Sequence, residues 1–269
     1  MLPILVWVGM ILFFLNIKNI PYDFSEKDAM VVRLIAKVLY TIVLPLILIR
    51  FIYKEKSDFG IYFPRVRESM KLTWRALSIA GPAAMTFPLI GWLGWSFADW
   101  RGSLMLSLAF FAVFYFIPKI TSSLPTRNNL SIPNNRIYGL TLLSILTIGI
   151  TYSTYHILPI FWKLCYYALI VGFGEELFFR GYLQSALNRY FGKSFSLGKV
   201  QFGWGLILAA LLFGLSHALL TVPPTWPWAL WTFIFGLTLG FIREKDGSIL
   251  AAVLLHAIMD LPLAFMTVS

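Results

Sequence analysis

Apolar runs about as long as a membrane-crossing helix, roughly 20 residues, recur along the whole chain and limit what it can fold into. Of the 269 residues, 59% are hydrophobic and 13% are charged. Soluble domains typically carry about a quarter charged residues, so this composition lies well outside the soluble range. The sequence therefore predicts an all-α polytopic membrane protein, that is, an integral, multi-pass membrane protein.

Nine apolar runs are candidate transmembrane spans, or eight if the first lies along the membrane interface, and we expect them to form one helical bundle. The first run has no basic residue before it and no small-residue cleavage site after it, so it is predicted to be a retained span. Pro82, Pro88, Gly91 and Gly94 fall in the third run, which is therefore expected to be kinked or broken. The runs are residues 1–17, 31–53, 72–98, 103–118, 138–158, 161–184, 203–222, 226–243 and 248–267.

The loops between the runs indicate an orientation. Residues 50–75 hold seven basic and three acidic residues, and the loops 119–136 and 185–202 hold basic residues without any acid. With nine spans these loops fall on one side, so the positive-inside rule places the N-terminus in the cytoplasm. The net charge of +10 is thereby explained by topology and attraction to anionic lipid, and no nucleic-acid partner is predicted.

One polar, turn-rich stretch divides the chain. The linker PTRNNLSIPNNR, residues 125–136, separates an amino-terminal group of about four helices, residues 1–124, from a carboxy-terminal region, residues 137–269. Cys165 is the single cysteine, so an intrachain disulfide and a cysteine-based metal site are both excluded. The chemically informative residues follow the linker.

Ionisable side chains occur within the last five apolar runs. Each costs about 2.5–3.5 kcal/mol at mid-bilayer on insertion scales, and such groups usually face a partner inside the bundle. Asp246 in REKDG is predicted to lie in a short solvated loop, and His156, near a span end, is predicted to be a hydrogen-bonded core residue. The remaining candidates for an intramembrane polar site are Glu175, Glu176, Arg180, His217, His256 and Asp260.

Helical spacing sorts these candidates. Neighbouring residues point about 100° apart on a helix, so Glu175 and Glu176 cannot face one spot. Glu176 and Arg180 are four residues apart and can form an ion pair, which leaves Glu175 to face a different partner. The same spacing places His256 and Asp260 on one helix face. It also places Phe213 and His217 together.

Three helices thus each project a small polar cluster, and this arrangement has three interpretations. Glu175 with the two histidines could hold a water, take its proton and stabilise an oxyanion. Alternatively, a buried Glu–Arg pair serves helix packing, and a histidine on an apolar helix is a hydrogen-bonded core residue. A proton-coupled transporter would use the same residue types, although no inverted repeat is present.

Three short motifs in order carry a family resemblance. EELFFR, residues 175–180, fits EExxxR and is followed by GYL; FGLSH, residues 213–217, fits FxxxH; and HAIMD, residues 256–260, fits HxxxN/D. Over residues 160–267 the chain resembles the CPBP group of intramembrane proteases, which includes type II CAAX prenyl endopeptidases and bacteriocin-processing or immunity (Abi) proteins.

This resemblance implies an endopeptidase that acts on a membrane-associated protein or peptide. Glu175 would be the general base, and His217 would position or polarise the water. His256 and Asp260 would form the oxyanion-stabilising side, while Glu176, Arg180 and Phe213 would brace the site. Asp260 stands where the eukaryotic prenyl proteases have asparagine, so the resemblance does not specify prenylated substrates. A non-catalytic member, acting as an assembly, immunity or scaffold factor within a membrane-protein complex, is the alternative.

Metal-free catalysis is favoured, with no cofactor required. The chain lacks HExxH, the compact zinc-binding motif. A divalent ion such as zinc, held by Glu175, His217 and His256 with an open position, remains the alternative.

Overall fold

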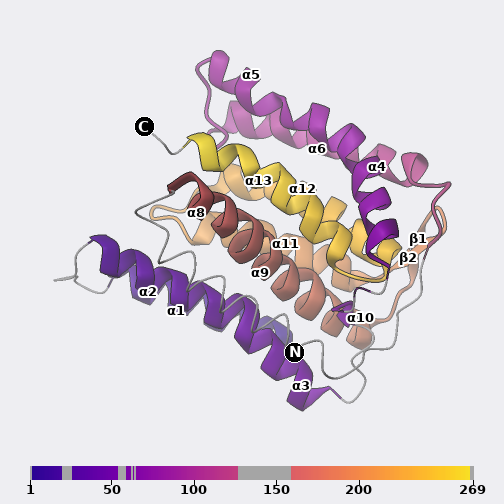
Figure 1. Ribbon diagram of the computed structural model, residues 1–269, viewed down its shortest axis with the longest axis horizontal. Helices are drawn as coiled ribbons and strands as arrows, with labels where there is room; N and C mark the ends of the chain where they lie inside the picture. The colour runs from indigo at the N-terminus through magenta and orange to yellow at the C-terminus, as the bar shows by residue number, and fades with distance from the viewer. Residues whose placement is uncertain are drawn as a thin grey trace.

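The computed structural model describes residues 2–19, 26–53, 59–61, 63, 65–126 and 159–266. Most of the predicted linker 125–136, the predicted span 138–158 and His156 therefore lie outside the described residues. The helices form three groups (Figure 1). The indigo helices α1–α3 lie on one side, the magenta helices α4–α6 lie on the other, and the carboxy-terminal helices lie between them.

The amino-terminal group contains α1 and one longer continuous helix. A π-helical segment interrupts the longer helix because Pro45, just after it, has no N–H to donate to the preceding turn. The Leu44 N–H instead donates to the carbonyl of Leu39, five residues earlier. The elements are α1 (Leu2–Asn19), α2 (Glu26–Val38), the π-helical segment η1 (Leu39–Val43) and α3 (Leu44–Ile52).

The second group confirms the predicted break in the third apolar run. Helix α4 contains Pro82 and ends at Ala84, and the helical run after it ends near Gly94, whose φ is +72°. The Asp99 carboxylate caps the next helix by accepting a hydrogen bond from the backbone N–H of Gly102. It also accepts one from the backbone N–H of Ser96, before the helix, and these two bonds lower the pKa of Asp99. The helices are α4 (Val66–Ala84), α5 (Thr86–Trp92) and α6 (Trp100–Ile120).

The carboxy-terminal group begins with one continuous helical run from Pro159 to Phe191 and continues with a hairpin and three helices. The run comprises α8 (Pro159–Cys165), η3 (Tyr166–Phe173), α9 (Gly174–Glu176), η4 (Leu177–Gln184) and α10 (Ser185–Phe191), in which η3 and η4 are π-helical. The remaining helices are α11 (Trp204–Leu219), α12 (Trp226–Asp246) and α13 (Leu250–Met266).

The fold is helical, but the all-α prediction is wrong in one detail. Strands β1 (Phe195–Leu197) and β2 (Val200–Phe202) form an antiparallel hairpin within the predicted loop 185–202. Gly198 makes the turn with a φ of +62°, a conformation that residues with a side chain rarely adopt. Phe195 lies opposite Phe202, and this aromatic cross-strand pair stabilises the short hairpin.

Apolar helices and apolar exposed side chains identify a membrane protein. Val31–Ile52 and Trp100–Ile120 are long and apolar enough to span a bilayer, and shorter apolar helices cover Leu2–Ile17, Trp204–Leu219 and Leu250–Pro262. Large hydrophobic side chains are exposed on the outside, including Trp92 at 82%. The eight or nine spans and the cytoplasmic N-terminus stay predictions.

The charged residues of REKDG do not form a solvated loop, and that prediction is wrong. Residues 243–246 form the last turn of α12, and all four are buried, with Asp246 only 1% exposed. Their burial is possible because partners come from distant parts of the chain. The Asp246 carboxylate accepts hydrogen bonds from the hydroxyls of Ser69 and Ser248, at 2.8 and 2.7 Å. The Lys245 ammonium donates to the carbonyl of Leu124 at 3.0 Å.

Close helix packing at Gly205 provides a stability prediction. A Cβ at Gly205, in the first turn of α11, would clash with the Gln184 carbonyl and with the Asn188 side chain. Gly205→Ala is therefore expected to lower the free energy of unfolding by about 1–3 kcal/mol, measured by thermal unfolding in detergent micelles. Gly91→Ala is the control, because nothing lies within 4 Å of that Cβ and alanine favours helix by about 1 kcal/mol. Equal effects of the two substitutions would contradict the packing argument.

Candidate active site

The predicted ion pair between Glu176 and Arg180 is confirmed. Arg180 Nη1 donates to Glu176 Oε1 at 2.7 Å, and both side chains are completely buried. Arg180 Nη2 donates to the carbonyl of Gly236 on α12 at 3.3 Å. The guanidinium carbon lies 4.4 Å from the ring centre of Phe213 on α11, a cation–π distance. Arg180 thus joins three parts of the carboxy-terminal group around Glu176.

His256 lies between two carboxylates. Its Nδ1 is 2.8 Å from Glu176 Oε1, the oxygen that also accepts from Arg180, and its Nε2 is 3.4 Å from Asp260 Oδ2. The predicted His256–Asp260 pair on one face of α13 is therefore present. Because ionised carboxylates only accept hydrogen bonds, this arrangement favours an imidazolium that donates from both ring nitrogens. His256 is thus positioned as a buried cation.

His217 lies in the last turn of α11 with a defined tautomer. Its Nδ1 is 2.9 Å from the backbone carbonyl of Phe213, four residues earlier on the helix. A carbonyl oxygen can only accept, so Nδ1 carries the hydrogen and Nε2 of the neutral ring has a free lone pair. The predicted shared face is present as well, since the ring centres of Phe213 and His217 are 4.6 Å apart. His217 can therefore accept a proton or a hydrogen bond at Nε2.

Glu175 is the acidic residue predicted to be the general base, and its side chain is 14% exposed. Its carboxylate interacts electrostatically with His217 and His256, so the structure brings the three predicted groups near each other. One oxygen, Oε1, lies 2.8 Å from Lys37 Nζ. The other, Oε2, is buried and has no hydrogen-bond partner among the described residues. One carboxylate oxygen is thus held in place while the other is left to interact with a small molecule.

Lys37 is the site residue that the sequence analysis missed. It lies on α2, in the amino-terminal group, and pairs with Glu175. Helical spacing gave the Glu175 carboxylate no partner on the helix that carries it. A usable signal existed, because Lys37 is an ionisable residue inside the apolar run 31–53. Helical spacing could not identify its partner, however, since residues 37 and 175 meet only through the tertiary fold.

The donor arrangement does not fit the metal ion that the alternative mechanism requires. Among the described residues, no group of three or more His, Cys, Asp or Glu side chains is placed to hold a metal ion. The Lys37 ammonium at Glu175 Oε1 would also repel a cation bound there.

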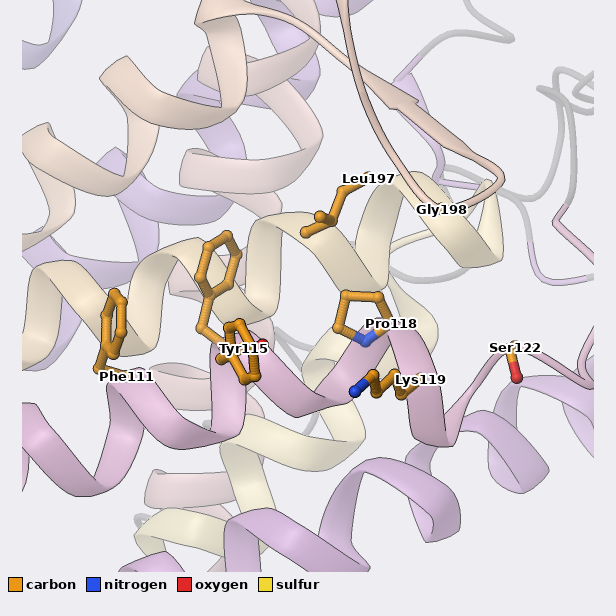
Figure 2. Close-up of a pocket in the computed structure, with 8 residues that line it drawn as sticks. Phe111, Tyr115, Pro118, Lys119, Ser122, Leu197 and Gly198 are labelled. Carbon is orange, nitrogen blue, oxygen red and sulfur yellow. The ribbon is translucent and has the colours of Figure 1, made fainter.

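A surface groove of about 530 Å³ lies apart from these residues. Figure 2 shows it between aromatic side chains of α6 and the turn of the β-hairpin. Its described lining offers Lys119 at one end but no carboxylate or imidazole, so it lacks the groups for acid–base chemistry. The lining residues are Phe111, Phe114, Tyr115, Pro118, Lys119, Ser122, Leu197 and Gly198.

Comparison with known families identifies the region that carries the site. The model of the family described as type II CAAX prenyl endopeptidase Rce1-like matches residues 157–262, about two fifths of the chain. Over residues 157–262 the chain is similar to this family. This confirms the resemblance that the three motifs indicate. No curated protein and no solved structure matches the chain.

The Rce1-like region contains every predicted site residue, from Glu175 to Asp260. Rce1-like proteins are a protease family, so a protein or peptide is the expected kind of substrate. Lys37 lies outside the Rce1-like region, although its ammonium contacts the site. The site is therefore assembled from two regions of the chain.

Proposed function

We propose that this protein is an intramembrane endopeptidase that hydrolyses a peptide bond in a membrane-associated protein or peptide. The observation that carries the proposal is the Glu175 carboxylate, whose buried Oε2 has no hydrogen-bond partner in the described part of the chain and which interacts electrostatically with both histidines. A carboxylate in such a setting can take a proton from water. The similarity of residues 157–262 to a protease family supports this assignment.

The proposed reaction uses side chains alone. Glu175 Oε2 takes a proton from water while His217 Nε2 accepts a hydrogen bond from it. The water oxygen attacks the carbonyl carbon of the scissile peptide. In this proposal the positive charge of His256, which interacts electrostatically with Glu175, stabilises the negative charge that develops on the carbonyl oxygen. When the C–N bond breaks, Glu175 returns the proton to the leaving amine, which balances the reaction.

Asp260 and the Glu176–Arg180 pair act through His256 in this proposal. Asp260 Oδ2 faces His256 Nε2, and Glu176 Oε1 faces His256 Nδ1, so the two acids fix the ring from both sides. An aspartate that orients the imidazole is consistent with the departure from the asparagine of the prenyl proteases. The proposal accordingly specifies a membrane-associated substrate and does not specify whether it is prenylated.

Replacing Glu175 with Gln tests the proposal. The amide cannot take a proton from water, so cleavage is expected to slow by about 10²–10⁴-fold. New peptide termini in membranes from cells expressing the wild-type chain or the variant would be compared by mass spectrometry. Identical termini with folded, equally abundant proteins would refute the proteolytic assignment and favour the scaffold alternative. Loss of cleavage on adding a chelator to the purified wild-type protein would contradict the metal-free reaction.

A further inference from the structure

The amino-terminal helices contact the candidate site directly. Figure 1 shows the α2–α3 run beside the α8–α10 run that carries Glu175. At their contact, a Cβ on Gly174 would lie 2.6 Å from the Thr41 hydroxyl, so a larger residue would force the Thr41 side chain to shift. On another side, Trp7 Nε1 of α1 donates to the hydroxyl of Ser216, next to His217, at 2.8 Å. The amino-terminal group thus contacts Glu175 directly and also contacts Ser216, the residue before His217.

Lys37 is held where its ammonium can act on Glu175. Its backbone carbonyl accepts a hydrogen bond from the Thr41 hydroxyl at 2.8 Å, within the turn that packs on Gly174. Its ammonium lies 2.8 Å from Glu175 Oε1 and 5.6 Å from the ring centre of Tyr166 on η3. The side chain is 22% exposed, so it is largely removed from water. The ammonium is therefore fixed between a carboxylate and an aromatic face.

Counted over the described residues, the charges around Glu175 balance only when Lys37 is included. Three carboxylates, those of Glu175, Glu176 and Asp260, share this part of the bundle with His256. Arg180 Nη1 and His256 Nδ1 both approach Glu176, and His256 Nε2 also faces Asp260, whereas Lys37 is the cation in contact with Glu175. A buried carboxylate without a counter-charge takes up a proton. A protonated Glu175 could not act as a base.

We propose that Lys37 is a positioning residue of this site, whose ammonium holds one oxygen of Glu175 and keeps that carboxylate ionised within the membrane. The second oxygen then stays available to take the proton of water. The inference rests on the proposed function for its catalytic consequence, but the charge state of Glu175 can be measured independently. The titratable groups that interact electrostatically with Glu175 or Lys37 are Tyr166, Arg180, His217, His256 and Asp260.

Infrared spectroscopy tests the charge state without any substrate. The full chain in dodecyl maltoside micelles, whose detergent has no carbonyl group, would be examined at neutral pH as wild type, Lys37→Met, Lys37→Arg and the double variant Lys37→Met, Glu175→Gln. Lys37→Met is expected to gain the carbonyl band of a protonated carboxyl group. That band should be missing from the wild type, from Lys37→Arg and from the double variant. Its absence from Lys37→Met would overturn the inference, even if proteolysis were confirmed.

Measured cleavage rates test the catalytic consequence. The substrate is a peptide whose cleavage site is identified by the mass spectrometry of new peptide termini. Lys37→Met is expected to lower kcat by about 10²-fold with little change in KM. It should also move the acid limb of the pH–rate profile up by about one to three pH units. Lys37→Arg should restore most of the activity. Arg33→Met, an exposed position on the same helix, is the control and should behave as wild type.

The outcomes separate the two proposals. A merely structural lysine would lower the thermal unfolding midpoint but leave the pH profile in place, and this result would refute the positioning role. If Glu175→Gln abolishes cleavage while Lys37→Met keeps the wild-type kcat and pH profile, the proteolytic function stands and the positioning role fails. If Glu175→Gln leaves cleavage unchanged, the proteolytic mechanism fails, and the infrared band still decides whether Lys37 keeps Glu175 ionised.

Discussion

Replacing Arg180 with Met is expected to lower the free energy of unfolding by about 3–5 kcal/mol, because it leaves a buried carboxylate without its strongest partner. Arg180 and Glu176 are both fully buried, and their nitrogen and oxygen are 2.7 Å apart. The guanidinium also donates to Gly236 and covers the Phe213 ring, so its loss affects α11 and α12 as well. Unfolding in mixed detergent micelles measures the change. The variant should also lose the proposed proteolysis, since Glu176 orients His256.

Two further variants make this result interpretable. Arg101→Met removes an exposed arginine from the first turn of α6 and should change stability by no more than about 0.5 kcal/mol. The double variant Glu176→Gln, Arg180→Met also removes the buried carboxylate that has lost its guanidinium partner, so it should be more stable than Arg180→Met alone. A double variant as unstable as the single one would show that shape, and not charge, determines the loss.

Glu244→Ala is expected to destabilise the protein by a similar amount, about 3–5 kcal/mol. The buried Glu244 carboxylate accepts hydrogen bonds from Gln184 at 2.7 Å, Asn188 at 2.8 Å and Lys193 at 2.6 Å. It also lies 3.2 Å from Arg243 Nη1. Alanine removes the acceptor that joins α12 to η4, α10 and the segment before the hairpin. The free energy of unfolding in detergent micelles measures the loss.

A graded series tests whether this carboxylate is the cause. Glu244→Gln keeps an acceptor oxygen and should have an intermediate effect. Lys193→Met removes a donor that is 31% exposed, and such partly exposed ion pairs are worth about 0–1 kcal/mol. The expected order of destabilisation is Glu244→Ala, then Glu244→Gln, then Lys193→Met. Equal losses for Glu244→Ala and Lys193→Met would contradict the assignment.

Local periodicity was sufficient for the contacts made within one helix. The four-residue spacing predicts Glu176 with Arg180 and His256 with Asp260, and both pairs are present. Prolines and glycines in the third apolar run predict the break that follows Ala84. The roles assigned to Glu175 and His217 remain predictions. In each successful case the interacting atoms are fixed by backbone geometry that a short segment determines by itself.

Contacts between distant segments could not be predicted in this way. Lys37 meets Glu175 because Gly174 lets the turn at Thr41 approach, which depends on the packing of whole helices. The charged string at residues 243–246 has the composition of a solvated loop, yet it is buried. Its partners include Ser69 and Gln184, which no sequence window would join to it. Tertiary partners therefore override local polarity at the carboxy-terminal end of α12.

The contacts of Trp7, Lys37 and Thr41 with the Rce1-like region restrict how the protein can be divided or recombined. In a fragment limited to residues 157–262, Glu175 and Ser216 would lose their contacts with Lys37 and Trp7 and would be exposed to lipid. A chimera that takes this region from a related protein would place that protein's counterparts of Glu175 and Ser216 against Lys37 and Trp7 of this chain. These contacts would form only where both parents have matching residues. The two regions are therefore expected to be exchangeable only as a pair.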